Sequence, residues 1–269
     1  MLRRIAPFAA DLISHRELLW QFTLRNVEMR HKGSYLGIVW SILNPLLMLA
    51  LYVLVFGYIF SGTFGRAGET RLEYGLTIFL GLTLFHFVTE TFVTAPIVIV
   101  GNPNFVKKVV FPLEILPAAN VGGAAIHLLI GLALVLLGVV TLGDGLTLSA
   151  LWLPVILFPL LLTCLGLNWL FSALGVFLRD LAQLIQFLSL ALLFASAVFY
   201  PSSRIPPDVW PVMRFNPALI AIDLSRHTVL WHEPIRGTHL AYLYAVGLLS
   251  CYVGYAIFRR LKPAFADVL

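Results

Sequence analysis

Six charge-poor apolar tracts dominate the sequence, and each is long enough to cross a hydrocarbon core about 30 Å thick. The tracts cover residues 35–60, 74–98, 115–141, 151–178, 181–200 and 239–258, and the fifth is the shortest. In lipid, backbone polar groups must be satisfied within a helix or a closed barrel. Because the tracts lack the in-and-out alternation of barrel strands, the sequence predicts an all-α polytopic membrane protein with six transmembrane helices.

Composition leaves little room for a soluble catalytic domain. The chain is 60% hydrophobic and 12% charged, so we divide it into a cytoplasmic N-terminal region (1–34), a transmembrane domain (35–260) and a cytoplasmic tail (261–269). The formal net charge of +5 is compatible with nucleic-acid binding, but Lys and Arg in a membrane protein more often set its orientation. We therefore expect no nucleic-acid partner.

The distribution of basic residues predicts the orientation of the chain. Twelve of the 18 Lys and Arg residues fall on one side of the predicted membrane, namely Arg3, Arg4, Arg16, Arg25, Arg30, Lys32, Lys107, Lys108, Arg179, Arg259, Arg260 and Lys262. Cytoplasmic loops of membrane proteins carry an excess of Lys and Arg. We therefore expect both termini to be cytoplasmic.

Residues 11–32 have a helical pattern but are too charged to cross a membrane. One polar stripe recurs at steps of three or four residues and consists of Ser14, Glu17, Gln21, Arg25, Glu28 and Lys32. The pattern predicts an amphipathic helix at the cytoplasmic surface. Two interpretations remain open, a helix that lies in the headgroup layer and a helix that packs on the protein's own base.

The second connection, residues 101–112, contains strong helix signals. Asn102 can cap a helix with Pro103 at its first position, and Pro112 prevents its continuation. The prediction is a cytoplasmic helix of about two turns that displays the side chains of Phe105, Lys107, Lys108, Val109 and Phe111. We expect this apolar and basic surface to dock into a groove on a cytoplasmic partner, although a turn lying against lipid headgroups is the alternative.

Residues 201–237 are predicted to be extracytoplasmic, yet they are rich in large apolar side chains. Asn216 and Pro217 again form a cap and first-turn pair. We interpret the segment as two short re-entrant helices that dip back towards the membrane. Within it, Asp223 can pair with Arg226 or His227 at helical spacing, a contact that we expect to be structural.

Motifs for chemistry are absent from the sequence. No G-x-x-x-x-G-K-[ST] occurs, so we predict no ATP site, no bound cofactor and no enzymatic activity of the chain itself. His86 and Glu90 lie one turn apart in the second span and His127 lies in the third, which is compatible with a proton relay or a metal pair. Two ligands do not make a metal site, however, and Glu90 is near enough to the cytoplasmic end to reach headgroups or water.

Aromatic side chains form the remaining pattern. Tyr52, Phe56 and Phe60 recur along one side of the first span. A second group lies on the fifth span and comprises Gln183, Gln186, Phe187, Phe194, Phe199 and Tyr200. Aromatic faces can stack on the C–H faces of sugar rings, which suits a sliding polymer. Such a stripe is more often helix packing or a lipid-interface belt, so the residues alone favour those interpretations over a channel.

The order of short motifs resembles a known family. The motifs are Leu36-Gly37 with Trp40, Asn44-Pro45, Asn102 to Lys108, Phe111-Pro112, Arg179-Asp180-Leu181, Tyr200-Pro201, and Asn216-Pro217 with Arg226. This combination resembles the permease subunits of polysaccharide-exporting ABC transporters, which serve O-antigen, teichoic acid and capsule. It looks closest to the O-antigen and teichoic acid branch, because the loop from Lys107-Lys108 to Phe111-Pro112 is intact.

The resemblance implies a homodimer of six-helix subunits in a bacterial cytoplasmic (inner) membrane, in contact with membrane lipids. Two copies of a separate ABC ATPase would bind ATP and Mg²⁺, and the exported molecule would be a lipid-linked polysaccharide such as O-antigen. Teichoic acid, capsule, or a small lipid or drug are alternative substrates. A secondary transporter is disfavoured because no inverted repeat is visible, and a membrane-bound transferase because no catalytic cluster is.

The resemblance also implies roles for individual residues. The contacts to the ATPase would come from Glu17, Arg25, Asn102, Phe105, Lys107, Lys108 and Phe111. The gate at the outer mouth would include Trp210, Phe215, Asn216 and Arg226. The resemblance and the aromatic pattern together assign eight residues to the substrate channel, namely Tyr52, Phe56, Phe60, Gln183, Phe187, Phe194, Phe199 and Tyr200.

Overall fold

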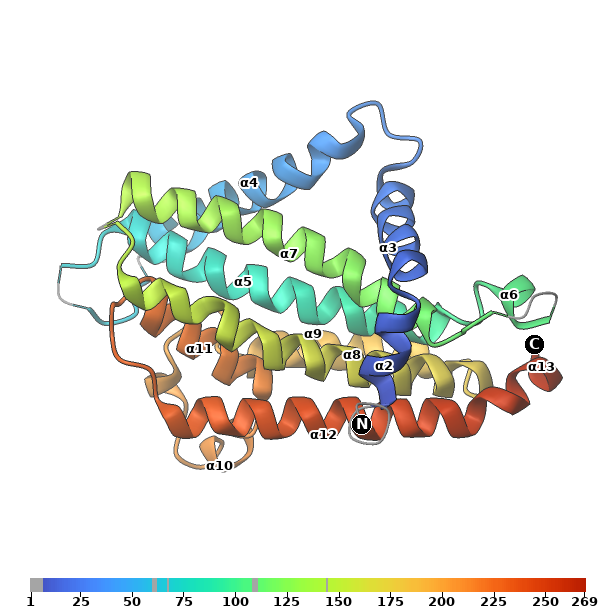
Figure 1. The fold of residues 1–269 in the computed structure, drawn as a ribbon. Helices are drawn as coiled ribbons and strands as arrows, with labels where there is room; N and C mark the ends of the chain where they lie inside the picture. The colour runs from blue at the N-terminus through green and yellow to red at the C-terminus, as the bar shows by residue number, and fades with distance from the viewer. Residues whose placement is uncertain (1–6, 60–61, 67, 108–110, 144) are drawn as a thin grey trace.

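A computed structural model describes residues 7–59, 62–66, 68–107, 111–143 and 145–269. The described residues form helices and connecting segments and contain no β-strand. Figure 1 shows long helices side by side in one bundle, with α3 running across the bundle and α4 diverging from it. Helices α6 and α13 lie at one end of the bundle, whereas α10 and α11 lie towards the other.

Twelve α-helices and several short 3-10 or π segments make up the described chain. The α-helices are α2 (Pro7–Ser14), α3 (Arg16–His31), α4 (Trp40–Tyr52), α5 (Arg71–Thr94), α6 (Pro103–Lys107), α7 (Ile115–Leu142), α8 (Leu153–Phe177), α9 (Leu181–Ala195), α10 (Trp210–Met213), α11 (Pro217–Val229), α12 (Gly237–Leu261) and α13 (Phe265–Val268). The short segments are η1 (Gly37–Val39), the π-helical η2 (Val53–Ile59), η3 (Ala95–Ile97), η4 (Leu148–Trp152), η5 (Ser202–Arg204) and η6 (Lys262–Ala264).

Five of the six predicted tracts form helices of membrane-spanning length. These are Trp40–Ile59, Arg71–Ile97, Ile115–Leu142, Leu148–Phe177 and Gly237–Val268. The remaining tract forms α9, which has only 15 residues. At 1.5 Å per residue, α9 is about 22 Å long, which is less than the hydrocarbon core of about 30 Å. The sixth span therefore stays a prediction.

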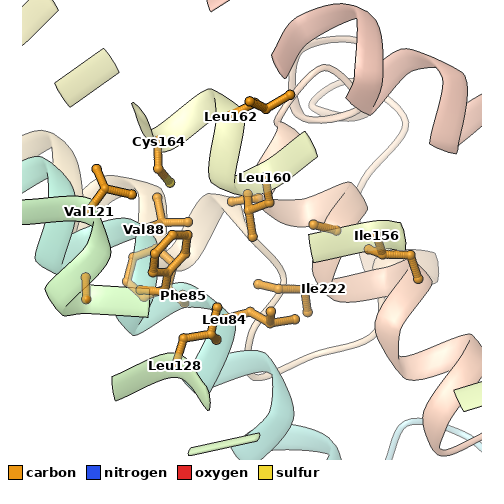
Figure 2. Packing of buried hydrophobic residues seen from close by; sticks show 14 of the residues in the cluster. Leu84, Phe85, Val88, Val121, Leu128, Ile156, Leu160, Leu162, Cys164 and Ile222 are labelled. Carbon is orange, nitrogen blue, oxygen red and sulfur yellow. The ribbon is translucent and has the colours of Figure 1, made fainter. Parts of the chain in front are cut away.

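Helix α5 is the centre of the packed core. In its most apolar window 67% of the residues are buried, compared with 6% for the span that contains α4. Figure 2 shows side chains of three other helices directed towards α5, whose own contribution includes Leu84, Phe85 and Val88. The facing residues are Val121 and Leu128 of α7, Ile156 and Leu160 of α8, and Ile222 of α11. Helix α4 thus lies at the edge of the subunit.

Local signals account for several helix ends. A capping box begins α5, because Thr70 Oγ1 accepts a hydrogen bond from the Glu73 amide at 3.2 Å and Glu73 Oε2 accepts one from the Thr70 amide at 2.7 Å. Pro154 occupies the first turn of α8, and Gly143 follows the end of α7. These local signals set where the helices begin and end.

Small residues allow α8 and α12 to pack closely. A Cβ atom added at Gly166, Gly247 or Gly254 would lie within 3 Å of backbone atoms of the partner helix. Close backbone contact through small residues is the usual means by which helices associate in membranes. The pair forms a rigid side of the bundle, away from the diverging α4 (Figure 1).

The N-terminal segment forms two helices, because the chain breaks at His15 between α2 and α3. Thr23 and Val27 of α3 are buried, and the Thr23 side chain lies against Gly122 of α7. Of the two interpretations left open, the structure shows a helix packed on the protein's own base. Trp20 remains 57% exposed, so this packing leaves one large aromatic side chain on the surface.

Candidate functional site

A large cavity lies between α3, α4, α5, α7 and α9, with a volume of about 1020 Å³. More than half of the lining side chains are polar, namely Asn26, Arg30, Tyr52, His86, Thr89, Glu90, Thr94, Asn120, His127, Gln183, Gln186 and Ser189. Polar and ionisable groups are costly in membrane segments and mark substrate or ion pathways. We therefore take this cavity as the candidate site.

Five of the predicted channel residues lie at the cavity or stack beside it. Tyr52, Gln183 and Phe187 line the cavity. The Tyr52 ring centroid is 5.9 Å from that of Phe56 and 5.6 Å from that of Phe199. Phe56 and Phe199 in turn stack at 5.0 Å with an interplanar angle of 16°. The π-helical η2 begins directly after Tyr52 and contains Phe56, and such irregular turns are frequent at functional sites.

The other three predicted channel residues are placed differently. Phe60 lies outside the described residues. Phe194 is 59% exposed and is not part of the cavity lining. The half-buried Tyr200 is also absent from the lining, and its hydroxyl donates to the Phe194 carbonyl. Phe194 and Tyr200 therefore do not line this cavity of the single subunit, and their assignment to the channel stays a prediction.

A charged cluster occupies the wall of the cavity formed by α3, α5 and α7. Arg30 Nη1 forms an ion pair with Glu90 Oε1. His127 Nδ1 lies 3.0 Å from the same Glu90 oxygen and 2.9 Å from Arg30 Nη1. Glu90 therefore pairs with its own protein, where the sequence suggested headgroups or water. Among the described residues no group of three potential ligands could hold a metal ion.

Two hydroxyl groups of the residues that line the cavity lack a hydrogen-bond partner. The Oγ atoms of Thr89 and Ser189 are buried and have no hydrogen-bond partner among the described residues. Asn120 Nδ2, by contrast, donates to Thr94 Oγ1 at 2.8 Å. Sequence reasoning missed Arg30 and Asn120 as site residues, because only the tertiary packing of α3 and α7 brings them to Glu90 and Thr94.

The predicted ATPase-contact loop packs against α3. Phe22 of α3 has its ring centroid 5.4 Å from Phe105 and 5.2 Å from Phe111, and the last two are 4.7 Å apart. Phe105 and Phe111 are half-buried in this cluster, and their contact with a partner stays a prediction. Lys107 is exposed at the end of α6, and Lys108 lies outside the described residues.

Polar contacts join the same two elements. Asn102 Oδ1 accepts a hydrogen bond from Arg25 Nη2 at 3.4 Å, and Asn102 Nδ2 donates to the Val98 carbonyl at 2.9 Å. The Arg25 guanidinium lies 5.1 Å from the Phe22 ring centroid. Helix α6 begins at Pro103 as predicted. Glu17 is exposed near the start of α3, so the contact network includes Arg25 but not Glu17.

The predicted gate region contains the two short helices α10 and α11. Asn216 caps α11 as predicted, because its Oδ1 accepts from the Ala218 amide at 3.0 Å. Its Nδ2 donates to the Ala195 carbonyl at 2.9 Å, which ties α11 to the end of α9. Trp210 is half-buried at the start of α10, and Phe215 is 55% exposed.

Arg226 is buried and binds three backbone carbonyls. Its Nε donates to Thr77 at 3.2 Å, its Nη1 to Ala197 at 2.8 Å and its Nη2 to Val198 at 2.5 Å. The guanidinium also lies 4.6 Å from the Phe64 ring centroid. Ala197 has a φ of 49°, a strained conformation for a residue with a Cβ. Arg226 thus fastens α11 to α5 and to the turn after α9.

The open choice for Asp223 is settled in favour of His227. His227 Nε2 lies 3.5 Å from Asp223 Oδ2, and its Nδ1 lies 2.6 Å from Glu233 Oε2. The hydrogen bond with Asp223 raises the pKa of His227 above its usual value, although burial opposes the shift. Burial alone would raise the pKa of Asp223, but hydrogen bonding and charge from His227 lower it overall. The pair is a structural contact, as expected.

Comparison with known proteins gives consistent matches over most of the chain. A family model described as ABC-2 type transporter matches residues 17–230. An O-antigen export system permease protein RfbA of Klebsiella pneumoniae is 27% identical over 254 residues, 94% of this chain and 95% of that protein. RfbA of Myxococcus xanthus is 25% identical over 96% of this chain and 97% of its own length. The polysialic acid transport protein KpsM of Escherichia coli is 25% identical over 90% and 92%.

Proposed function

The chain belongs to the ABC-2 type transporter family, and we propose that it is the channel-forming subunit of an exporter that moves lipid-linked polysaccharide across the bacterial cytoplasmic membrane. The observation that carries this proposal is the large polar cavity with the Tyr52 aromatic stack at its wall. Relatives named as O-antigen export permeases match along nearly their full length. The named substrate of those relatives is the basis for assigning a glycan to this cavity.

The cavity suits a sugar polymer in both size and chemistry. Pockets for drug-sized ligands have volumes of about 300–1,000 Å³, so a cavity of about 1020 Å³ has room for several sugar units. The exposed Gln183 and Gln186 offer hydrogen-bonding groups for sugar hydroxyls. Tyr52 and Phe187 offer ring faces that tolerate sliding.

A second copy of the chain would complete the channel. The cavity is bounded on one side by α4 and α9. In the span that contains α4, only 6% of the residues in the most apolar stretch are buried. A polar cavity that opened directly to lipid would be costly. We infer that a homodimer joins through this side and closes the cavity against the acyl chains, with α9 as the sixth span.

A separate ABC ATPase would supply the energy. The chain itself has no P-loop and, in this proposal, binds no cofactor. The exposed Glu17 and Lys107 lie on α3 and α6, which are joined through Phe22 and Phe105. A partner that pushes on either element would move both. Both termini lie on this cytoplasmic side in the proposed topology.

Export of a capsule-type polysaccharide is the second candidate, favoured by the match to a polysialic acid transport protein. Depletion of the chain in its host tests both. The expected result is loss of surface glycan with accumulation of lipid-linked glycan inside, reversed by the wild-type chain. Unchanged surface glycan together with altered efflux of a lipid or drug would overturn the glycan assignment.

A further inference from the structure

Two cavities meet at one group of side chains. Besides the large polar cavity, a narrower cavity of about 200 Å³ lies between α4, α5 and α7. Its wall away from the junction is mainly apolar and consists of Trp40, Ser41, Asn44, Pro45, Met48, Phe79, Thr83, Phe87, Leu128 and Gly131. Both cavities are lined by the same four titratable residues, Arg30, His86, Glu90 and His127.

The junction already holds an anionic oxygen. Arg30 Nη1 and His127 Nδ1 come from different helices, yet both contact Glu90 Oε1. An Arg guanidinium binds carboxylates and phosphates through the same planar donor geometry. The Arg30 side chain is 50% exposed, so its remaining donors are accessible to a ligand. Glu90 thus occupies a position that an external oxyanion could take.

Building on the proposed function, we propose that this junction binds the phosphate or diphosphate group of a lipid-linked glycan. The apolar chain would follow the narrow cavity beside α4, and the first sugars would enter the large polar cavity. Such a ligand carries its negative charge between an apolar chain and a polar glycan. The narrow cavity runs along Pro45 and Met48 of α4, and the larger cavity reaches Gln183 and Gln186 of α9.

Glu90 is the competing anion in this assignment. When a phosphate arrives, Arg30 exchanges the Glu90 carboxylate for a phosphate oxygen, and His86 and His127 can add further donors from the same wall. Removing Arg30 therefore removes a ligand of the phosphate, whereas neutralising Glu90 removes its competitor. If the Arg30–Glu90 ion pair were only structural, both substitutions would change ligand binding in the same direction.

The test compares binding by Arg30→Gln and Glu90→Gln in the full-length permease, purified into phosphatidylcholine nanodiscs. The probe is farnesyl diphosphate, titrated calorimetrically beside farnesol, inorganic diphosphate and phosphatidylglycerol. Lys262→Gln is the control variant, because it breaks the Lys262–Glu114 ion pair at 2.9 Å, which lines neither cavity. It should leave affinity unchanged.

We expect Arg30→Gln to weaken farnesyl diphosphate binding by about tenfold or more, as for loss of one hydrogen bond to a charged group. Glu90→Gln should tighten it severalfold. Farnesol and inorganic diphosphate should each bind more weakly than the probe. Equal binding of farnesol and farnesyl diphosphate, or a shift in the same direction for both variants, would overturn the proposal.

Equal, Arg30-dependent binding of phosphatidylglycerol would also overturn the assignment, since the site would then hold bulk anionic lipid. These results are separate from the proposed export function, which fails only if surface glycan persists without the chain.

Discussion

Replacement of Arg226 by Met tests whether a buried cation holds the outer part of the bundle together. The Arg226 side chain is 1% exposed and donates to the carbonyls of Thr77, Ala197 and Val198. Met has a similar length and apolar stem but no donor. The variant therefore removes the donor from these three carbonyl groups while it fills most of the same space.

The expected cost follows from the contacts. The Thr77 carbonyl also accepts within helix α5, so two carbonyls lose their partner. At about 1–3 kcal/mol for each unsatisfied acceptor, the gross loss is about 2–6 kcal/mol. The Met variant also removes the cost of burying a charge, which offsets part of that loss. We expect a net destabilisation of about 2–4 kcal/mol. At about 2–4 °C per kcal/mol for chains of this size, the apparent melting temperature should fall by about 10 °C.

Two further variants make the assay specific. Arg214→Met removes an exposed cation that lies over the Phe215 ring at 4.8 Å, and it should change stability by less than about 0.5 kcal/mol. Gly81→Ala should act like Arg226→Met, because a Cβ at Gly81 would lie 2.5 Å from Arg226 Nη2. Thermal unfolding of the detergent-purified permease is measured by size-exclusion chromatography after heating. Equal melting temperatures for Arg226→Met and Arg214→Met would refute the reasoning.

Three further predictions concern transport and topology. Phe105→Asp should abolish export and also lower the stability of the permease by breaking the half-buried aromatic cluster. Lys107→Glu should abolish export while the permease stays at its normal abundance. Surface glycan and permease immunoblots that both match the wild type would contradict this. Tyr52→Leu and Phe187→Leu should each reduce surface glycan, because both side chains line the cavity. Phe194→Leu should be nearly neutral, since volume-conserving apolar swaps usually cost less than about 1.5 kcal/mol. Equal export by all three variants would refute the aromatic channel. A cysteine at Asp267 should react with a membrane-impermeant thiol reagent only in inverted vesicles, and labelling in intact cells would reverse the orientation.

Features that depend on neighbouring residues were predicted well. The cap of α11 by Asn216 was read from the sequence, because an N-cap needs only a side-chain oxygen two or three residues before its amide donor. The start of α6 at Pro103 was also predicted, but the Asn102 side chain binds Arg25 and the Val98 carbonyl and not an amide of α6. The lengths of five spans followed from uninterrupted apolar composition. Helix α9 was overestimated, since apolar residues continue to Tyr200 while the backbone turns after Ala195.

Features that depend on distant partners were missed or misassigned. Phe105 carries an apolar side chain that suits either a partner groove or its own protein, and only the position of Phe22 on α3 shows the second. The gate role of Arg226 stays a prediction, but the sequence did not show that its donors bind carbonyls of α5 and of the turn after α9. No local pattern indicates which carbonyls a buried guanidinium will reach.

The sequence by itself determined that this protein is a helical membrane protein, because hydrocarbon solvent requires continuous apolar segments with internally satisfied backbones. It also determined the family, through the order of its motifs. Only the tertiary structure decided that Arg30, Glu90 and His127 meet at the border of two cavities. Their meeting depends on how α3, α5 and α7 pack, and packing geometry is set by contacts between residues far apart in the chain.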